Sequence, residues 1–511
     1  MIGRKSVTLQ NKLQIKKMRK QLLTFFCLLC LGSASATGIY NVRDFGAKGD
    51  GTTLDSPAIN AAIEAAVADG GGQVLLPAGT YLSGSIRLKS NIDLHLAAGC
   101  TILAADPKDF PKEQRGSLYD KSESFGGFPE YQDGGHTYFH NSLIWAEGQT
   151  NVSITGHGMI DGKGLTKKDT ENSGNIQGGS IGTGDKAIAL KLCRQVTIRD
   201  ITIFRGGHFA IIMTGCDLST IDNVTIDTNR DGFDIDCCKY MTITNCKINT
   251  PRDDALVLKS SYALKKPVPC EHIAISNCVI TGYKLGTLLD GTYEPEPVNW
   301  VCGRFKLGTE SNGGYRNIAL TNCTFMYSSG LAFEEVDQGR MENIVVSNIT
   351  MSHVHHYPIY ITTGCRNRGP KEVTRRSSAR DIQISNVVAD DCDSLCSIIV
   401  TGMKDEPIRN VWLSNIRLQF KGGGAKELVN KDYREQGTNY PEPKFAGQTP
   451  AYGLYARHVV GLHVNDVSFS YERPDYRPAI VLDDVKDATL DNIDAPTEEG
   501  VEKVVGMNYE L

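Results

Sequence analysis

Three aspartates in two neighbouring segments have the residue type and spacing for acid–base chemistry. The segment "LSTIDNVTIDTNRDGFDID" (218–236) aligns without a gap with "YMTITNCKINTPRDDALVL" (240–258), and equivalent residues are 22 apart. This alignment places Asp231 opposite Asp253, with Asp254 one residue further along. Strands in consecutive repeats stack about 4.8 Å apart. The three carboxylates are therefore expected to meet at one spot, with Arg230 beside them.

Carboxylates held this close repel one another, and the repulsion raises the pKa of at least one of them. A carboxylic acid can then protonate a leaving oxygen while a neighbouring carboxylate activates water or attacks carbon, which is how glycosidic bonds are cleaved. Aspartates at strand corners also cap turns, and Asp–Arg pairs can form structural ladders. The alignment of three aspartates across two repeats favours catalysis over that structural interpretation.

The elements that must position these aspartates follow from a recurring phrase: an alternating apolar run, an Asn or Asp, and a second apolar pair. It appears as "YMTITNCKI" (240–248), "HIAISNCVI" (272–280), "NIALTNCTF" (317–325) and "NIVVSNITM" (343–351), among other copies. Alternation with period two indicates short strands, and Asn or Asp is typical of the corner between them. Strand-only repeats at this spacing predict an all-β fold, a single right-handed parallel β-helix.

The N-terminal end of this solenoid is predicted to carry a capping helix. Residues 57–68 have a helical pattern: Asp55 or Ser56 caps it, Pro57 suits its first turn, and "DGGG" ends it. We expect residues 37–511 to form one β-helix catalytic domain, in which residues 37–105 provide the N-terminal cap and the first coils. The helix would cover the open end of the stack.

Residues 1–36 have the pattern of a secretory signal peptide. "KKMRK" is the basic segment, "LLTFFCLLCL" is the apolar segment, and "ASA" (34–36) is a small-residue cleavage site. Met18 could be the true start, which would make residues 1–17 an upstream extension. The apolar run is too short for a good membrane span. We therefore expect a secreted or periplasmic protein that begins near Thr37.

Composition excludes several classes of partner. The net charge is −5 and the isoelectric point is about 6.2, so no basic field points to nucleic acid. We expect a monomer without a membrane span. No Cys/His grouping has the spacing of a zinc site. Cys246, Cys278 and Cys323 occupy the same slot of the repeat and are interpreted as small buried hydrophobes.

At this point the chain resembles glycoside hydrolase family 28, the polygalacturonases and related pectin-degrading enzymes. Asn229-Arg230-Asp231 matches the family's Asn-x-Asp signature, and Asp253-Asp254 matches the Asp-Asp of the next coil. The resemblance implies that Asp253 is the general acid, while Asp231 and Asp254 position and deprotonate the attacking water. It also implies inversion of configuration in one displacement, without metal or cofactor.

The chain departs from the family pattern at two places. Where the family has Gly-His-Gly, this chain has "CGRFKLGTESNGG", and where the family has Arg-x-Lys, it has "GLAFEEVDQG", with Ala332 and Glu334 at the two basic positions. These losses argue against plain polygalacturonate in that subsite and allow a neutral sugar such as rhamnose. Nearby cations could still hold one uronate on the other side. The predicted substrate-binding residues are Asn229, Lys259, Arg304, Lys306, Glu310, Glu334 and His208.

Several of these assignments have alternatives. His208 is one coil before Asp231, and a buried histidine without contact to substrate is an equally good interpretation of it. The alternative for Lys259 is a solvated lysine at the edge of a strand. Tyr293 and Trp300 are candidates for stacking on sugars or for packing a loop. Two long segments, residues 107–136 and 420–450, interrupt the repeat, and they are either functional loops or plain surface insertions. If they wall off one end of the cleft, the enzyme acts on chain ends.

The sequence thus predicts an exported, inverting, exo-acting glycosidase that cleaves galacturonate-containing pectin fragments, of the polygalacturonate or rhamnogalacturonan type. A first alternative is a polysaccharide lyase on the same scaffold, which would need a base near the uronate C5 and often calcium. A second is a non-catalytic, carbohydrate-binding β-helix, which would not need three aligned carboxylates.

Overall fold

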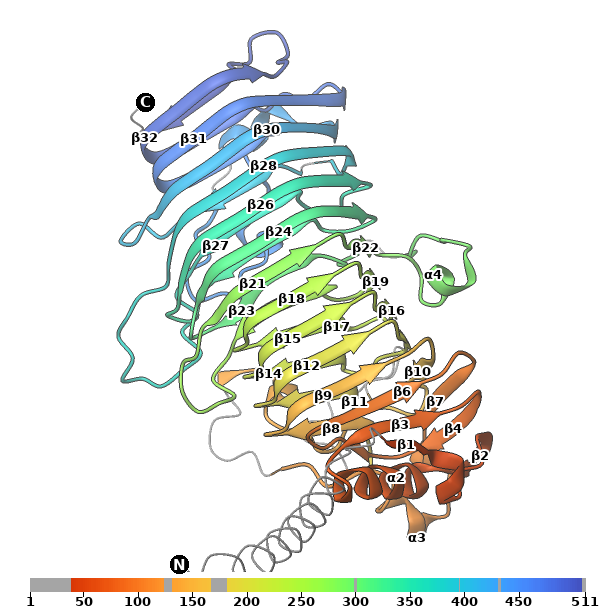
Figure 1. The fold of residues 1–511 in the computed structure, drawn as a ribbon. Coiled ribbons are helices and arrows are strands. Elements are labelled where there is room, and N and C mark those ends of the chain that lie inside the picture. Colours follow the sequence, from red (N-terminus) through yellow and green to blue (C-terminus); the bar gives the residue numbers. More distant parts are fainter. Residues whose placement is uncertain are drawn as a thin grey trace, which may run out of the picture.

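The computed structural model describes residues 38–123, 131–166, 182–297, 301–394, 396–430 and 433–507. The predicted signal peptide, residues 1–36, and Trp300 lie outside these ranges. Strands stack in parallel pairs from one end of the molecule to the other and form an elongated solenoid (Figure 1). Within the described ranges, none of the helices is long and apolar enough to cross a membrane.

Each coil contributes strands to three series, and every strand pairs in parallel with its equivalent in the next coil. The first series contains β1 (Gly38–Asn41), β3 (Gly72–Leu76), β6 (Ile92–Leu96), β9 (Thr150–Thr155), β12 (Arg194–Arg199), β15 (Asp217–Asp222), β18 (Lys239–Thr244) and β21 (Cys270–Ser276). The second contains β2 (Asp50–Leu54), β4 (Gly79–Ser83), β7 (Cys100–Ala104), β10 (Met159–Asp161), β13 (Thr202–Phe204), β16 (Thr225–Asp227), β19 (Lys247–Asn249) and β22 (Val279–Thr281).

The third series carries the catalytic candidates. It contains β5 (Ile86–Arg87), β8 (Ile144–Glu147), β11 (Lys186–Lys191), β14 (Phe209–Thr214), β17 (Asp231–Asp236), β20 (Leu256–Ser260), β23 (Phe305–Ser311), β25 (Leu331–Glu335), β27 (Ile359–Thr363) and β29 (Ile398–Thr401). Longer strands run around a corner in the later coils: β24 (Tyr315–Met326), β26 (Arg340–Ser352), β28 (Ser378–Cys392), β30 (Ile408–Gly422), β31 (Leu454–Arg473) and β32 (Ile480–Asp494). The last strand is β33 (Val504–Met507).

The apolar residues of the repeat point into the solenoid and stack on their equivalents in the next coil. Ile221, Ile243, Ile275 and Leu320 are consecutive partners in four coils, and all four are buried. Burying one such side chain contributes roughly 1.5–3 kcal/mol. Cys246, Cys278 and Cys323 are buried in the same way, and the described cysteines are free thiols, so the interpretation of these three as buried hydrophobes is confirmed.

The corner residues predicted from the repeat adopt the left-handed conformation. Asn245, Asn277, Asn322 and Asn348 have φ angles of 60°, 58°, 56° and 57°. Asparagine tolerates this conformation better than most residues with a side chain. The side-chain amides of Asn277 and Asn348 donate to the asparagine one coil earlier, to Asn245 at 3.2 Å and to Asn322 at 3.1 Å, and the amide of Asn245 donates to Asp222 at 2.7 Å. The ladder holds the corners of successive coils together.

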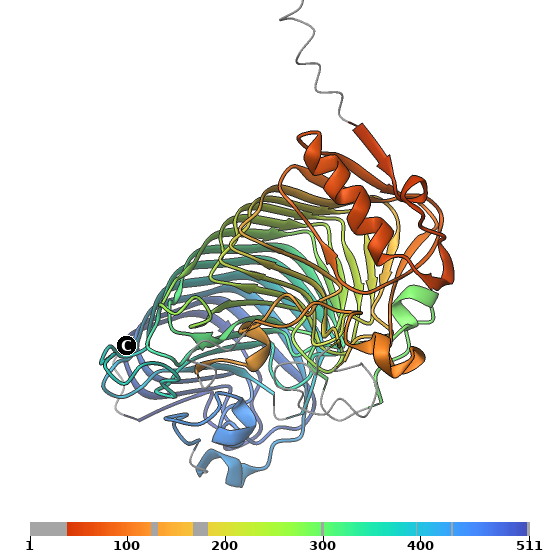
Figure 2. The ribbon, with the colours of Figure 1, turned by 90° about the horizontal axis from the view of Figure 1, so that it is seen from below.

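The helix predicted near the N-terminus is α2 (Ser56–Ala68), preceded by η1 (Val42–Phe45). Its Ile59, Ala62, Ile63 and Ala66 are buried, and it lies across the N-terminal end of the coils in the axial view (Figure 2). Its function as a cap remains a prediction. The other short helices are η2 (Pro107–Asp109), α3 (Lys112–Arg115), η4 (Gly134–His136), α4 (Thr287–Asp290), η5 (Lys426–Asn430) and α5 (Pro443–Ala446).

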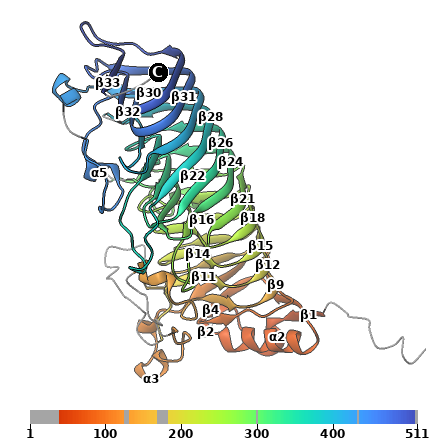
Figure 3. The same ribbon diagram turned by 90° about the vertical axis from the view of Figure 1, so that its left-hand side faces the viewer.

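The third strand series is buried on both faces, unlike the first. Strand β18 alternates exposed and buried residues, whereas every residue of β14, β17, β20, β23, β25 and β27 is buried. Residues of the two segments that interrupt the repeat contact this series: His136 lies beside Asp234 and Asp236, and Glu442 pairs with Arg304, next to β23. Figure 3 shows α3 and α5, one from each segment, on the same side of the solenoid. Both segments are therefore part of the environment of the catalytic candidates.

Candidate active site

The turn between β19 and β20 is one residue longer than the alignment of the two coils predicted. Asp227 pairs with Asn249, an offset of 22, but Phe233 pairs with Leu256, an offset of 23. The prediction of a constant offset was therefore wrong after Asn249. The backbone amide of Gly232 donates to the carbonyl oxygen of Asp254 at 3.0 Å, so Asp254 follows the strand register. Asp253 belongs to the longer turn, which carries its side chain toward solvent.

The carboxylate of Asp254 is enclosed by cations. Arg304 Nε donates to its Oδ1 at 2.5 Å, and Lys306 Nζ lies 3.4 Å from its Oδ2. Cys302 Sγ lies 3.4 Å from Oδ1 as well. Burial alone would raise the pKa of Asp254, but the charges of Arg304 and Lys306 outweigh burial and lower it well below its usual range. Asp254 is therefore ionised at neutral pH.

Asp231 and Asp253 have different surroundings. Asp231 is buried, and its pKa is raised well above the usual value by burial and by the nearby charge on Asp253. Asp253 is partly exposed, and its Oδ2 lies 2.7 Å from Nη1 of Arg230. The three aspartates thus lie in one site, where the pKa of Asp231 is raised and the pKa of Asp254 is lowered. Asp231 keeps its proton, whereas Asp254 does not.

A second ion-pair network lies along the same strands. Lys259 Nζ lies 3.3 Å from Asp234 Oδ2 and 3.2 Å from Glu310 Oε2, and all three side chains are buried. Burial would lower the pKa of Lys259, but the charges of Asp234 and Glu310 raise it well above its usual value. The interpretation of Lys259 as a solvated edge lysine is therefore wrong, because the side chain is 9% exposed and has two carboxylate partners.

The first insertion contributes a buried histidine to this network. His136 Nε2 lies 3.3 Å from Asp234 Oδ2, and its Nδ1 lies 3.1 Å from Asp236 Oδ2. Burial is the largest effect and lowers the pKa of His136, but the charge of Asp234 and the hydrogen bonds to Asp234 and Asp236 together outweigh it and raise the pKa to about 10. The same insertion places Asp133 Oδ1 3.3 Å from His208 Nε2. His208 is 1% exposed and stacks on Phe209, which fits its interpretation as a buried histidine and leaves no surface for a sugar.

Glu334 lies inside the site, at a position where the family resemblance leads one to expect the lysine of the Arg-x-Lys motif. Its Oε2 lies 3.4 Å from Lys306 Nζ, and neither carboxyl oxygen has a hydrogen-bond partner among the described residues. Burial raises the pKa of Glu334. The charges of Lys306 and Arg304 oppose that shift, and the pKa of Glu334 is about 7. Ala332 is the strand partner of Lys306. Lys306 therefore lies one coil before the first of the two positions where the family has Arg-x-Lys.

The second insertion closes over Arg304 and Lys306. Glu442 accepts hydrogen bonds from Arg304 at 2.7 and 3.2 Å, and Arg304 also donates to the hydroxyl of Tyr357. The ring of Tyr440 lies 5.6 Å from Lys306 Nζ, within range of a cation–π contact. Arg304 and Lys306 are 3% and 2% exposed as a result. Their positive charges face protein carboxylates and do not face solvent.

The structure brings together nearly all of the residues that the sequence nominated. Asp231, Asp253, Asp254, Lys259, Arg304, Lys306, Glu310 and Glu334 belong to connected ion pairs and charge interactions, and Asn229 is buried next to Arg230. Sequence reasoning missed His136, Tyr440 and Glu442. Their only sequence signal was their location in two long segments rich in Gly, Tyr and charge, because no repeat register relates those segments to a coil.

Two groups of described residues could place three ligand atoms within 4.8 Å of one another. They are Asp253, Asp254 and Cys302, and Glu123, His140 and Glu147. Both contain groups that already have partners, since Asp254 is bound by Arg304, and Glu147 lies 2.8 Å from His140 and 3.0 Å from Lys191. Neither group has the ligand set of a structural zinc site, and we assign no metal to either.

Similar proteins match both the sequence and the fold. The family model "Rhamnogalacturonase A/epimerase, pectate lyase-like" matches residues 39–256. A probable polygalacturonase of Vitis vinifera is 28% identical over 401 residues, 75% of this chain and 74% of that protein. An exopolygalacturonase of Platanus acerifolia is 24% identical over 417 residues, 77% of this chain and 93% of that protein.

The solved structure of a family 28 exopolygalacturonase of Yersinia enterocolitica aligns with a TM-score of 0.62 and 18% identity. The alignment covers 89% of this chain and 78% of that one. Together these matches confirm the resemblance and the right-handed parallel β-helix that the sequence predicted.

Proposed function

We propose that this chain is a polygalacturonase-like glycosidase that hydrolyses α-glycosidic bonds of galacturonate-containing pectic oligosaccharides from their ends, with inversion. The observation that carries the proposal is the pairing of carboxyl groups with opposite protonation preferences in one site. Asp231 has a raised pKa and Asp254 a lowered one. A site that holds a neutral and an ionised carboxyl group together is what glycosidic bond cleavage requires.

In the proposed mechanism, Asp253 donates a proton to the glycosidic oxygen as the bond to the leaving sugar breaks. A water molecule attacks the anomeric carbon from the opposite face and gives its proton to the Asp231–Asp254 pair. Asp254 suits the second task because Arg304 and Lys306 keep it ionised. General acid–base catalysis of this kind contributes about 10²- to 10⁴-fold to the rate.

Cleavage at chain ends is supported by the second insertion. Tyr440 and Glu442 cover Arg304 and Lys306, so the protein itself occupies the space over this end of the site. A polysaccharide running through the site would have to pass this point. An open groove would be the expected arrangement for an enzyme that cleaves in the middle of a polymer.

The test is to digest polygalacturonate and rhamnogalacturonan oligosaccharides in parallel and to identify the released sugar and its anomer by NMR. We expect small products from one chain end, with the anomeric configuration opposite to that of the cleaved bond. Products that absorb in the ultraviolet, with a calcium requirement, would instead establish a lyase. Binding without any product would establish a non-catalytic β-helix.

We also propose that the protein is exported and acts as a monomer. The basic, apolar and small-residue segments of residues 1–36 support export. Fractionation of cells that produce the full chain, with N-terminal sequencing of the mature protein, tests export and the cleavage point. Light scattering of the purified protein tests the oligomeric state.

A further inference from the structure

The buried cations of the site are already neutralised by protein carboxylates. Lys259 faces Asp234 and Glu310, and Lys306 faces Asp254 and Glu334. Arg304 likewise has Asp254 and Glu442 as its two partners. A negatively charged sugar therefore gains little from these three cations unless the protein gives up an existing ion pair.

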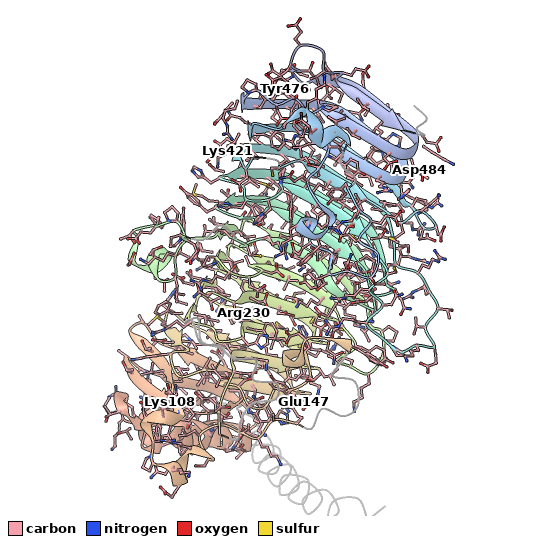
Figure 4. All side chains as sticks on the ribbon, turned by 180° about the vertical axis from the view of Figure 1, so that it is seen from behind. Lys108, Glu147, Arg230, Lys421, Tyr476 and Asp484 are labelled. Atoms are coloured by element: carbon pink, nitrogen blue, oxygen red, sulfur yellow. The ribbon has the colours of Figure 1, made fainter. Side chains whose placement is uncertain are left out.

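Arg230 differs from them in exposure and in partner. Its side chain is 34% exposed, and the ion pair that it forms is with Asp253, whose side chain is 24% exposed. It precedes β17 directly and lies on the face of the solenoid shown in Figure 4. A guanidinium at the surface, one residue from Asp231, is the accessible positive charge beside the catalytic carboxyl groups. It also has the fork of N–H donors that binds a carboxylate with two hydrogen bonds.

We propose that a uronate carboxylate of the substrate replaces Asp253 on Arg230, and that this exchange moves the catalytic proton onto Asp253. The inference rests on the proposed function, because it supplies the acid that the mechanism needs. In the free enzyme the guanidinium of Arg230 is the ion-pair partner of the Asp253 carboxyl group, 2.7 Å away. Binding of a uronate removes that partner and leaves Asp253 next to Asp231 and Asp254 without a counter-charge.

The proton balance of this exchange closes within the site. The charged and titratable groups that face Asp253 are Arg230, Asp231, Asp254 and the thiol of Cys302. Before binding, burial and the charge of Asp253 raise the pKa of Asp231 and favour the proton there. Afterwards Asp253 carries the same proton and Asp231 is ionised, ready to act on water. No proton enters or leaves, and the thiol stays neutral because burial raises the pKa of Cys302 well above its usual value.

Arg252 provides a matched control. It is the equivalent of Arg230 in the next coil of the sequence alignment, its side chain is 46% exposed, and it pairs with Glu296 at 2.9 Å. It therefore has similar chemistry and exposure but no catalytic carboxylate as its ion-pair partner. The variants to compare are Arg230→Gln, Arg230→Lys and Arg252→Gln, with unfolding midpoints measured for all three.

Two substrates separate charge recognition from a general loss of activity: a galacturonate oligosaccharide, and the same oligosaccharide with its carboxyl groups reduced to alcohols. For Arg230→Gln we expect KM for the charged substrate to rise by about 10- to 100-fold, the size of a lost charge-assisted hydrogen bond. KM for the reduced substrate should stay close to the wild-type value. Arg230→Lys should recover part of the affinity, and Arg252→Gln should leave both substrates unchanged.

The pH profile gives a second readout. If Arg230 is the ion-pair partner of the catalytic acid, removing its positive charge in Arg230→Gln should move the basic limb of kcat/KM to higher pH. If Arg230→Gln behaves like Arg252→Gln on both substrates, or weakens both substrates equally, the inference is wrong while the proposed function stands. If the wild-type protein cleaves neither substrate, the proposed function itself fails.

Discussion

The carboxylate of Glu442 accepts two hydrogen bonds from the guanidinium of Arg304, at 2.7 and 3.2 Å, across a sequence separation of 138 residues. Arg304 in turn donates to Asp254, so one ion-pair chain joins the second insertion to the candidate catalytic carboxyl groups. The insertion is therefore a structural part of the site.

This contact predicts that the insertion sets where the substrate is cut. In Glu442→Ala and Tyr440→Ala, the cover over Arg304 and Lys306 should loosen, and longer oligosaccharides should appear early in a digest of a pectic polymer. Chromatography of the product sizes over time measures the change. Phe445→Ala is the matched control, because Phe445 lies on the same insertion and is 44% exposed. A wild-type product pattern in both test variants would show that this part of the insertion does not direct cleavage.

How much of this arrangement was predictable depends on whether a residue belongs to a repeat. Period-two alternation and corner asparagines were enough to predict the coils, since each coil must bury its apolar face against the next. The same repeat register was enough to predict that Asp231 and Asp254 lie close together. His136, Tyr440 and Glu442 come from segments with no register, so their contacts depend on long-range packing. The extra residue in the turn at Asp253 was also hidden, because insertions of one residue leave the sequence alignment almost unchanged.

The asparagine ladder predicts a stability difference between two replacements at one corner. Asn322→Ala removes the ladder hydrogen bonds and places alanine at a φ of 56°, where a side chain without a polar group costs roughly 1–2 kcal/mol. Asn322→Gly loses the same hydrogen bonds but tolerates that angle. The alanine variant should therefore unfold at lower denaturant concentration than the glycine variant. Equal midpoints would mean that the backbone angle does not limit stability at this corner.

The proposed roles of the aspartates predict losses of activity without losses of fold. Asp253→Asn and Asp231→Asn should each lower kcat by about 10²- to 10⁴-fold, because an amide cannot donate or accept the catalytic proton. Release of reducing sugar measures the rate, and circular dichroism checks the fold. Asp405→Asn is the control, since Asp405 is 70% exposed and pairs with exposed Arg376. Near-normal turnover by Asp253→Asn would remove it from the mechanism.

Glu334 predicts a pH dependence of stability. Its folded-state pKa of about 7 is raised above the ordinary 4.5, so the folded protein holds this proton more tightly than the unfolded chain. The resulting stabilisation is complete below about pH 4.5 and is lost as the pH rises through about 7, a change of about 3 kcal/mol. In Glu334→Gln the free energy of unfolding should fall less steeply over this range than in the wild type.

Glu310→Gln is the matched control for that measurement. Glu310 is also buried and also lies beside a lysine, with 3.2 Å between its Oε2 and Lys259 Nζ, but the charges of Lys259 and Arg366 overcome burial and lower its pKa. A lowered pKa contributes stability that is lost only as the pH falls below the ordinary value. Glu310→Gln should therefore reduce stability at every pH from 4.5 to 7 while keeping the wild-type slope. If Glu334→Gln keeps that slope too, Glu334 is already ionised in the folded protein and forms a permanent ion pair with Lys306.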